Sequence, residues 1–142
     1  MLMNFVMGLS MMGVCLLLQG ILVIAALRYF ARRQDQLHSA FLSAMRVTVG
    51  LMLILIVGNV CQLVAWAMLF YSLGEFDTMG LAIYHSAVNF ATLGYGDIVM
   101  SAEHQLLGPL EALNGALMIG VTTAALSRAF AEAVKDRPFL SR

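Results

Sequence analysis

A string of six residues at positions 92–97, Thr-Leu-Gly-Tyr-Gly-Asp, combines residue types that suit the binding of a dehydrated cation by backbone oxygens. Such an ion exchanges its water shell for carbonyl oxygens, and successive peptides must then point toward one axis. L-residues avoid the dihedral angles that this requires, whereas glycine adopts positive φ readily, so Gly94 and Gly96 have the required spacing. Tyr95 can point away from the axis and brace the loop through packing and its hydroxyl, and Asp97 adds a carboxylate at the outer mouth. The string therefore predicts an ion-binding filter.

An ordinary glycine-rich surface turn is the alternative interpretation of this string, because two glycines separated by one residue are common in turns. The full six-residue string lies between two long apolar runs, however. That place in the chain favours the ion-binding interpretation.

The composition is typical of a membrane protein. Of the 142 residues, 61% are hydrophobic and 11% are charged, whereas a soluble domain carries about a quarter charged residues. Charged residues are absent from 2–27 and 47–74, and Glu111 is the only one in 104–127. Each run reaches the ~20 residues that a spanning helix needs. We therefore expect an all-α membrane protein with three transmembrane helices, at Leu2–Tyr29, Ala44–Leu73 and Leu106–Ala129.

Several other classes of protein are disfavoured. The first apolar run lacks the positive start of a signal peptide and is about twice as long as its apolar core, so we expect a retained helix. The formal net charge is zero, which gives no reason to expect nucleic acid as a partner. Cys15 and Cys61 lie in separate predicted helices and resemble apolar packing residues. No nucleophile–base pair or metal cluster suggests an enzyme, and we expect no cofactor.

The basic residues predict the orientation in the membrane. All eight lie either around the first connection or at the C-terminal end: Arg28, Arg32, Arg33, Arg46, Arg128, Lys135, Arg137 and Arg142. The connection between the second and third spans has none. The positive-inside rule then places the first loop and the C-terminus in the cytoplasm, and the N-terminus and the 92–97 string outside. We expect a multi-pass protein of the cell membrane.

A short apolar segment at 78–91 precedes the string and completes a hairpin. It is long enough to enter the membrane but not to cross it, and Asp77 or Thr78 can cap its first amides. A re-entrant helix is tolerated where its irregular return lines a water-filled cavity. Its C-terminus would direct partial negative charge toward a cation in the middle of the membrane.

Residues 44–130 resemble the pore module of potassium channels, in particular that of the small bacterial channels with two transmembrane helices. The resemblance implies a four-fold homotetramer in membrane lipid, because each chain supplies one filter strand. It also implies that potassium ions bind at the carbonyls of Thr92, Leu93, Gly94 and Tyr95, with Gly96 completing the filter and the Thr92 hydroxyl forming the innermost site. The implied organisation is an extra helix at 1–30, a cytoplasmic loop at 31–43, an outer helix at 44–73, a pore helix at 78–91, the filter at 92–97, an inner helix at 106–129 and a tail at 131–142.

The same resemblance assigns roles along the third span. Gly115 matches a flexible glycine that is often proposed as a gating hinge, and helix packing is the open alternative for it. Four further residues match positions that line the cavity, and their spacing places them on one helical face: Ala116, Ile119, Thr123 and Ser127. Small residues at every fourth position of this span would equally permit close helix packing.

Three positions depart from the pattern of the potassium channels. Leu93 replaces a more usual valine, Ala91 stands where many relatives have a hydroxyl, and Val88 stands where some relatives have a glutamate that braces the filter aspartate. Glu111 is a candidate replacement for that brace, since it could reach Asn89 or His85 behind the filter. A glutamate in the first helical turn after Pro109 is also favourable for the helix dipole alone, and this alternative stays open.

The sequence leaves some features without a role in conduction. Asn59 and Gln62 share a face of the second span and are expected to form hydrogen bonds between helices. The first helix has no assigned role, although the arginines at its end suit anionic lipid headgroups. Besides a potassium-selective channel, the sequence allows a weakly selective cation channel of the same fold and a non-conducting membrane scaffold or subunit.

Overall fold

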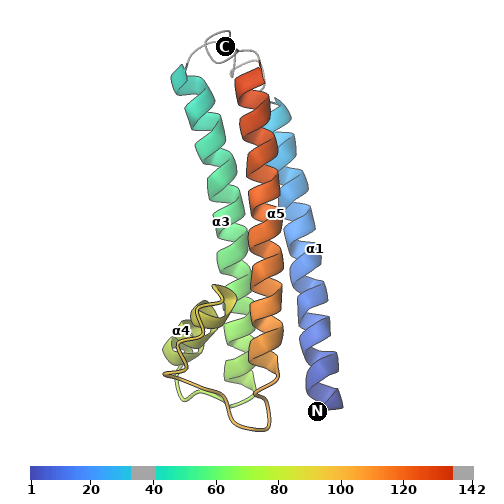
Figure 1. Cartoon of the computed structure of the whole chain (residues 1–142), viewed down its shortest axis with the longest axis vertical. Helices are drawn as coiled ribbons and strands as arrows, with labels where there is room; N and C mark the ends of the chain where they lie inside the picture. Colours follow the sequence, from blue (N-terminus) through green and yellow to red (C-terminus); the bar gives the residue numbers. More distant parts are fainter. Residues whose placement is uncertain (33–40, 136–142) are drawn as a thin grey trace.

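The described part of the chain consists of four helices. The computed structural model describes residues 1–32 and 41–135, and within these ranges it contains no strand. The helices are α1 (Leu2–Arg32), α3 (Phe41–Ser72), α4 (Met79–Phe90) and α5 (Leu107–Lys135). Figure 1 shows α1, α3 and α5 as long, nearly parallel rods, with the short α4 at the end of the bundle where the N-terminus lies.

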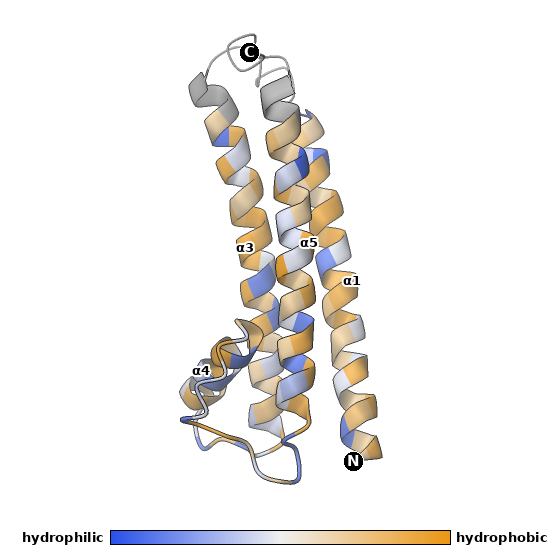
Figure 2. Cartoon of the chain, in the orientation of Figure 1, coloured by the Kyte–Doolittle hydropathy of each residue, from blue (hydrophilic) through white to orange (hydrophobic). Residues whose placement is uncertain are grey.

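The three long helices form because their sequences are long apolar runs with few charges. They contain spans that are long and apolar enough to cross a membrane, at Leu2–Arg32, Met45–Ser72 and Leu107–Ala131. Much of their apolar surface is exposed, including Leu17 at 71% and Leu53 at 57%, as expected where lipid replaces water. Apolar residues cover most of each rod in Figure 2, and polar residues are concentrated in a few bands.

All three long helices extend beyond the predicted limits, and α1 runs to Arg32 rather than ending at Tyr29. α3 begins at Phe41 rather than Ala44, and α5 runs to Lys135 rather than ending at Ala129. The extra residues of α5 are Phe-Ala-Glu-Ala-Val-Lys, which contain no proline or glycine and several strong helix formers. Hydropathy therefore marks where the apolar run ends, not where the helix ends. Residues 33–40 of the predicted loop and 136–142 of the predicted tail lie outside the described residues.

α1 packs against both α3 and α5, and α4 packs against the same two helices at one end of the bundle. The predicted cap of α4 is confirmed at Thr78, whose hydroxyl accepts a hydrogen bond from the Leu81 amide at 3.3 Å. α4 is thereby fixed at its start, while its end leads directly into the 92–97 string.

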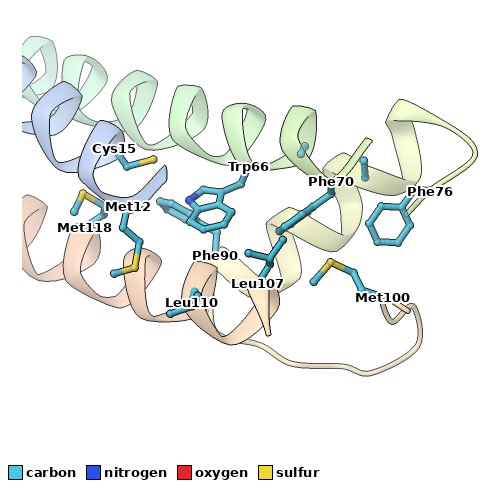
Figure 3. Close-up of a cluster of buried hydrophobic side chains, with 12 residues drawn as sticks. Met12, Cys15, Trp66, Phe70, Phe76, Phe90, Met100, Leu107, Leu110 and Met118 are labelled. Carbon is cyan, nitrogen blue, oxygen red and sulfur yellow. The ribbon is translucent and has the colours of Figure 1, made fainter. Parts of the chain in front are cut away.

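The interior contains two apolar clusters. The outer cluster lies at the α4 end of the bundle (Figure 3), and the inner cluster lies toward the other end. The outer cluster contains Met12, Cys15, Trp66, Ala67, Phe70, Phe76, Ala82, Phe90, Met100, Leu107, Leu110 and Met118. The inner cluster contains Ala26, Phe30, Val47, Leu51, Leu55, Ala125 and Ala129.

A layer of polar side chains separates the two clusters. We call it the polar junction; its members are Gln19 of α1, Asn59 and Gln62 of α3, and Thr122 of α5. On each of the three helices, the junction residues lie between the residues of the outer and inner clusters. The expected hydrogen bonds between helices are confirmed, since Asn59 donates to Thr122 at 3.3 Å and Gln62 donates to Gln19 at 2.7 Å.

Candidate functional site: the α4 hairpin and the 92–97 string

The 92–97 string is attached to the last turn of α4 by two backbone hydrogen bonds. The Thr92 amide donates to the Asn89 carbonyl at 2.8 Å, and the Leu93 amide donates to the Val88 carbonyl at 2.9 Å. These bonds satisfy carbonyls that the end of a helix would otherwise leave free. The string therefore begins in a fixed position relative to α4.

Every second residue of the string has a positive φ. The angles are 58° at Thr92, 60° at Gly94 and 72° at Gly96, and neither Leu93 nor Tyr95 is among the residues with positive φ. The expected left-handed backbone at the two glycines is confirmed. Thr92 was not anticipated, because a β-branched residue with positive φ is a genuine outlier. Such outliers persist where the surroundings impose them, and they concentrate at functional sites.

The two large side chains of the string are not packed within their own chain. Leu93 is 55% exposed and Tyr95 is 64% exposed. The predicted bracing by Tyr95 therefore does not come from packing inside one chain.

Asp97 has a partner that the sequence did not indicate. Its Oδ2 accepts a hydrogen bond from the Tyr84 hydroxyl at 2.6 Å, across the hairpin. This hydrogen bond lowers the pKa of Asp97 and raises that of Tyr84, which keeps the carboxylate charged at the end of the string. Tyr84 lies one helical turn before Val88, the position at which some potassium channels carry a glutamate that braces the filter aspartate. Because Tyr84 and Val88 share a face of α4, this spacing was the signal in the sequence that could have indicated Tyr84 as the partner of Asp97.

His85 connects α4 to the chain that leaves the string. Its Nδ1 lies 2.9 Å from the Ile98 carbonyl, and its Nε2 lies 2.8 Å from the Asn89 side-chain nitrogen. With Asn89 as donor, Nε2 accepts, so Nδ1 carries the proton and donates to Ile98. The ring also contacts Phe70 and Phe76, at centroid distances of 5.7 and 4.9 Å. Burial among these groups lowers the pKa of His85 and so favours the neutral ring that this arrangement requires.

Glu111 lies behind the hairpin and is fully buried. Its Oε1 accepts a hydrogen bond from the Ser86 hydroxyl, which also lies 2.8 Å from the Leu63 carbonyl. Asn89 is a further polar neighbour of the carboxyl. The contact with α4 that the sequence suggested is therefore present, but Ser86, which the sequence did not single out, is its principal partner.

The loop between the string and α5 is held by polar contacts with two other segments. Glu75 accepts hydrogen bonds from the backbone amide and the hydroxyl of Ser101, both at 2.6 Å, and contacts His104 Nδ1 at 2.5 Å. Burial raises the pKa of Glu75, but these hydrogen bonds outweigh it and leave the pKa below its ordinary value. The Asn4 side chain of α1 donates to the Glu103 carbonyl. Two distant segments thus fix this loop.

Gly115 lies where α5 meets the end of α4. A Cβ at this position would overlap the backbone carbonyl oxygen of Phe90, so the close approach of the two helices requires glycine there. This contact gives Gly115 a packing role. The proposed hinge role stays a prediction.

The predicted cavity residues lie on a part of α5 that the described chain leaves uncovered. All four are exposed: Ala116, Ile119, Thr123 and Ser127. Gly120 lies near this row, and a Cβ there would meet nothing within 4 Å. The structure therefore does not bring this row together with the filter residues within one chain, but it leaves the row free to face another molecule.

Comparison with known proteins gives one finding. The model of a family described as "Ion channel" matches residues 58–132, which is more than half of the chain and includes the last 15 residues of α3, all of α4 and most of α5. The search of curated proteins returned no match, and neither did the search of solved structures. With three helices that could cross a membrane, a short helix leading into a backbone of alternating φ, and this family match, the chain belongs to the Ion channel family.

Proposed function

We propose that this protein is a potassium-selective channel that conducts passively through a filter of backbone carbonyls. The single observation that carries the proposal is the positive φ at every second residue from Thr92 to Gly96. A backbone whose residues alternate between left- and right-handed conformations directs successive carbonyl groups to one side of the chain and the amide groups to the other. Carbonyl oxygens on one side are what a dehydrated cation needs.

In this proposal, potassium ions bind at the carbonyls of Thr92, Leu93, Gly94 and Tyr95, and the Thr92 hydroxyl adds the innermost oxygen. The exposure of Leu93 and Tyr95 supports this arrangement. If the carbonyls point toward the ions, these two side chains point away from them and must pack against another molecule. In the assembled channel, a neighbouring copy supplies those partners.

The assembly is a homotetramer in which each copy contributes one filter strand. Support comes from α5, since a helix of a finished bundle would not leave small and polar residues exposed along one side. Ala116, Thr123 and Ser127 would otherwise face lipid. In a tetramer the same row lines the central cavity, with Ile119 as its bulky member.

α4 acts as a re-entrant pore helix in this assembly. Its last turn is bonded to the start of the string, so the negative end of its dipole faces the position of the ions. The N-terminus and the hairpin lie at the same end of the bundle, as Figure 1 shows, in agreement with an outside location for both. The basic residues then place the opposite end in the cytoplasm.

The side chains around the hairpin hold the filter in shape. Asp97 is fixed by Tyr84 at the outer mouth, and Asn89 orients His85 toward the Ile98 carbonyl. Glu111 braces α4 from behind through Ser86. These contacts replace the glutamate brace that Val88 cannot provide.

The test is ion flux from liposomes that contain the purified protein and are loaded with potassium or with sodium. We expect potassium efflux, no sodium efflux, and loss of the potassium efflux in Gly96→Ala, because alanine at the positive φ of 72° costs about 1–2 kcal/mol and turns the carbonyls. Gly80→Ala is the matched control, since Gly80 lies in α4 and an added Cβ would meet only Thr78 Oγ1, at 3.9 Å. Equal potassium and sodium efflux would instead indicate a weakly selective channel. Flux that Gly96→Ala leaves unchanged would contradict the proposal.

A further inference from the structure

The polar junction connects α1 to the helix that carries the cavity row. α1 precedes residues 58–132, so the family match gives it no role. Within the bundle, however, α1 packs against α3 and α5. In the middle of α1, Gln19 forms a hydrogen bond to Thr122 of α5, and it is buried, with 1% of its surface exposed.

The hydrogen bonds of the junction form a directed chain that ends on α5. Gln62 Nε2 donates to Gln19 Oε1 at 2.7 Å, and Gln19 Nε2 donates to Thr122 Oγ1 at 3.4 Å. Asn59 Nδ2 donates to the same Thr122 oxygen at 3.3 Å. One hydroxyl of α5 is thereby held from two sides, by α1 and by α3.

Two of the junction amides, Gln19 and Gln62, are buried and have no alternative partner in water, whereas Asn59 is partly exposed. Apolar clusters lie above and below the layer on each helix. α1 and α3 approach closely here, because a Cβ at Gly58 would lie 2.6 Å from Leu22 Cδ1 and 3.2 Å from Gln19 Oε1. A polar layer between apolar layers favours one register of the helices, since a slip would break these three hydrogen bonds and leave the buried side-chain nitrogens of Gln19 and Gln62 unpaired. Asn59 Oδ1 and Gln62 Oε1 have no partner in the described residues.

Thr122 is directly followed by Thr123, which is exposed in the predicted cavity row. A rotation or translation of α5 that moves Thr123 must also move Thr122 relative to Gln19 and Asn59. The junction therefore resists any movement of α5 that would change the cavity.

We propose that Gln19 is a positioning residue for the pore, and that it acts through Thr122 to hold α5 in the position seen here. The role of α1 is then to restrain the pore-lining helix rather than only to anchor the protein in lipid. This inference rests on the proposed function for its effect on current, but the restraint itself can be measured without current.

The experiment compares single-channel recordings of Gln19→Leu, Thr122→Val and Thr122→Ser in planar bilayers. Valine removes the acceptor hydroxyl with little change in shape, and serine keeps it. We expect open probability to change by about three- to ten-fold, with the same sign in Gln19→Leu and Thr122→Val, on the scale of hydrogen bonds between membrane helices. Thr122→Ser should resemble the parent protein, and the Gln19→Leu/Thr122→Val double variant should change no more than either single variant.

Two further readouts separate positioning from a merely structural contribution. The current through an open channel and the reversal potential should be unchanged in all these variants, because the filter is not touched. Ser10→Ala is the control on α1, since Ser10 is exposed and bonds only within its own helix, to the Val6 carbonyl. Unchanged open probability in Gln19→Leu, or additive effects in the double variant, would overturn the inference.

Hydrogen–deuterium exchange of α5 amides, measured on the same purified variants, tests the restraint independently. Faster exchange around residue 122 is expected in Gln19→Leu and Thr122→Val, but not in Thr122→Ser or Ser10→Ala. If the parent protein carries no current, the proposed function fails, and the exchange rates still decide whether Gln19 restrains α5. Equal exchange in all variants would overturn the inference even if the parent protein conducts.

Discussion

The two sides of α5 differ in how much of their packing comes from their own chain. On one side, Glu111, Asn114 and Gly115 are buried, two of them without any exposed surface. On the other side, the cavity row is exposed along its whole length. One helix thus carries a face that folding of the single chain covers and a face that the described part of the chain leaves uncovered. The proposed tetramer needs this difference, because in it the uncovered face would line a cavity between copies of the chain.

The largest effect on stability is expected on the buried side of α5, at the close contact between Gly115 and the backbone of Phe90. Gly115→Val should lower the free energy of unfolding by more than about 3 kcal/mol, because the new side chain meets the backbone of Phe90, which cannot yield as a flexible side chain would. Gly120→Ala is the matched control. No neighbouring atom lies within 4 Å of its Cβ in the single chain, so the subunit should be unchanged or slightly more stable.

Unfolding in detergent, followed by circular dichroism, checks this pair of variants. Size measurement of the assembled protein adds a second readout, because a Gly120 face packed against another copy would be sensitive to the added methyl group. Similar stability losses in Gly115→Val and Gly120→Ala would contradict the contrast between the two sides of α5.

A smaller effect is expected from the hydrogen bond behind the hairpin. Ser86→Ala removes the principal donor to the buried Glu111, which should cost about 1–3 kcal/mol of unfolding free energy. Ser10→Ala removes an exposed hydroxyl of the same type and should change stability by less than about 0.5 kcal/mol. Chemical unfolding curves of both variants measure the difference, and equal effects would show that Ser86 does not brace the hairpin.

We expect His85 to make the stability of the hairpin sensitive to acid. Its folded-state pKa lies below the ordinary 6.5, so the neutral ring contributes stability that is complete above about pH 6.5. This contribution is lost as the pH falls through the folded-state pKa, because a charged ring can no longer accept the hydrogen bond from Asn89. Melting temperatures between pH 7.5 and 5 should therefore fall more steeply in the parent protein than in His85→Phe. Parallel curves would rule out this role of His85.

The smallest effect on stability is expected on the exposed side of α5. The Thr123 hydroxyl bonds to the Ile119 carbonyl of its own helix at 2.8 Å, so Thr123→Val should change the unfolding free energy by less than about 0.5 kcal/mol. In a tetramer, however, the same change replaces a polar group in the cavity, and the single-channel current should decrease. A large loss of stability with an unchanged current would reverse the assignment of the two sides.

The sequence predicted the elements of this fold well, because each depends on a local pattern. Uninterrupted apolar runs defined the three long helices, and Thr78 marked the start of α4. The spacing of Gly94 and Gly96 predicted where the backbone would be left-handed. Each of these features is encoded within a few adjacent residues.

The parts that sequence analysis missed depend on pairs far apart in the chain. Tyr84 reaches Asp97 only because the hairpin folds back, and Ser86 reaches Glu111 only because α4 packs on α5. The positive φ of Thr92 runs against the preference of its residue type, so no local rule indicates it. The contact between Gln19 and Thr122 spans most of the chain, and neither residue belongs to a motif.

The most direct measurement of the central claim is the reversal potential of the purified protein in planar bilayers, with potassium on one side and sodium on the other. A potassium-selective filter built on Gly94 and Gly96 predicts a value near the potassium equilibrium potential. A clear current that reverses near zero would contradict potassium selectivity while leaving the channel fold in place.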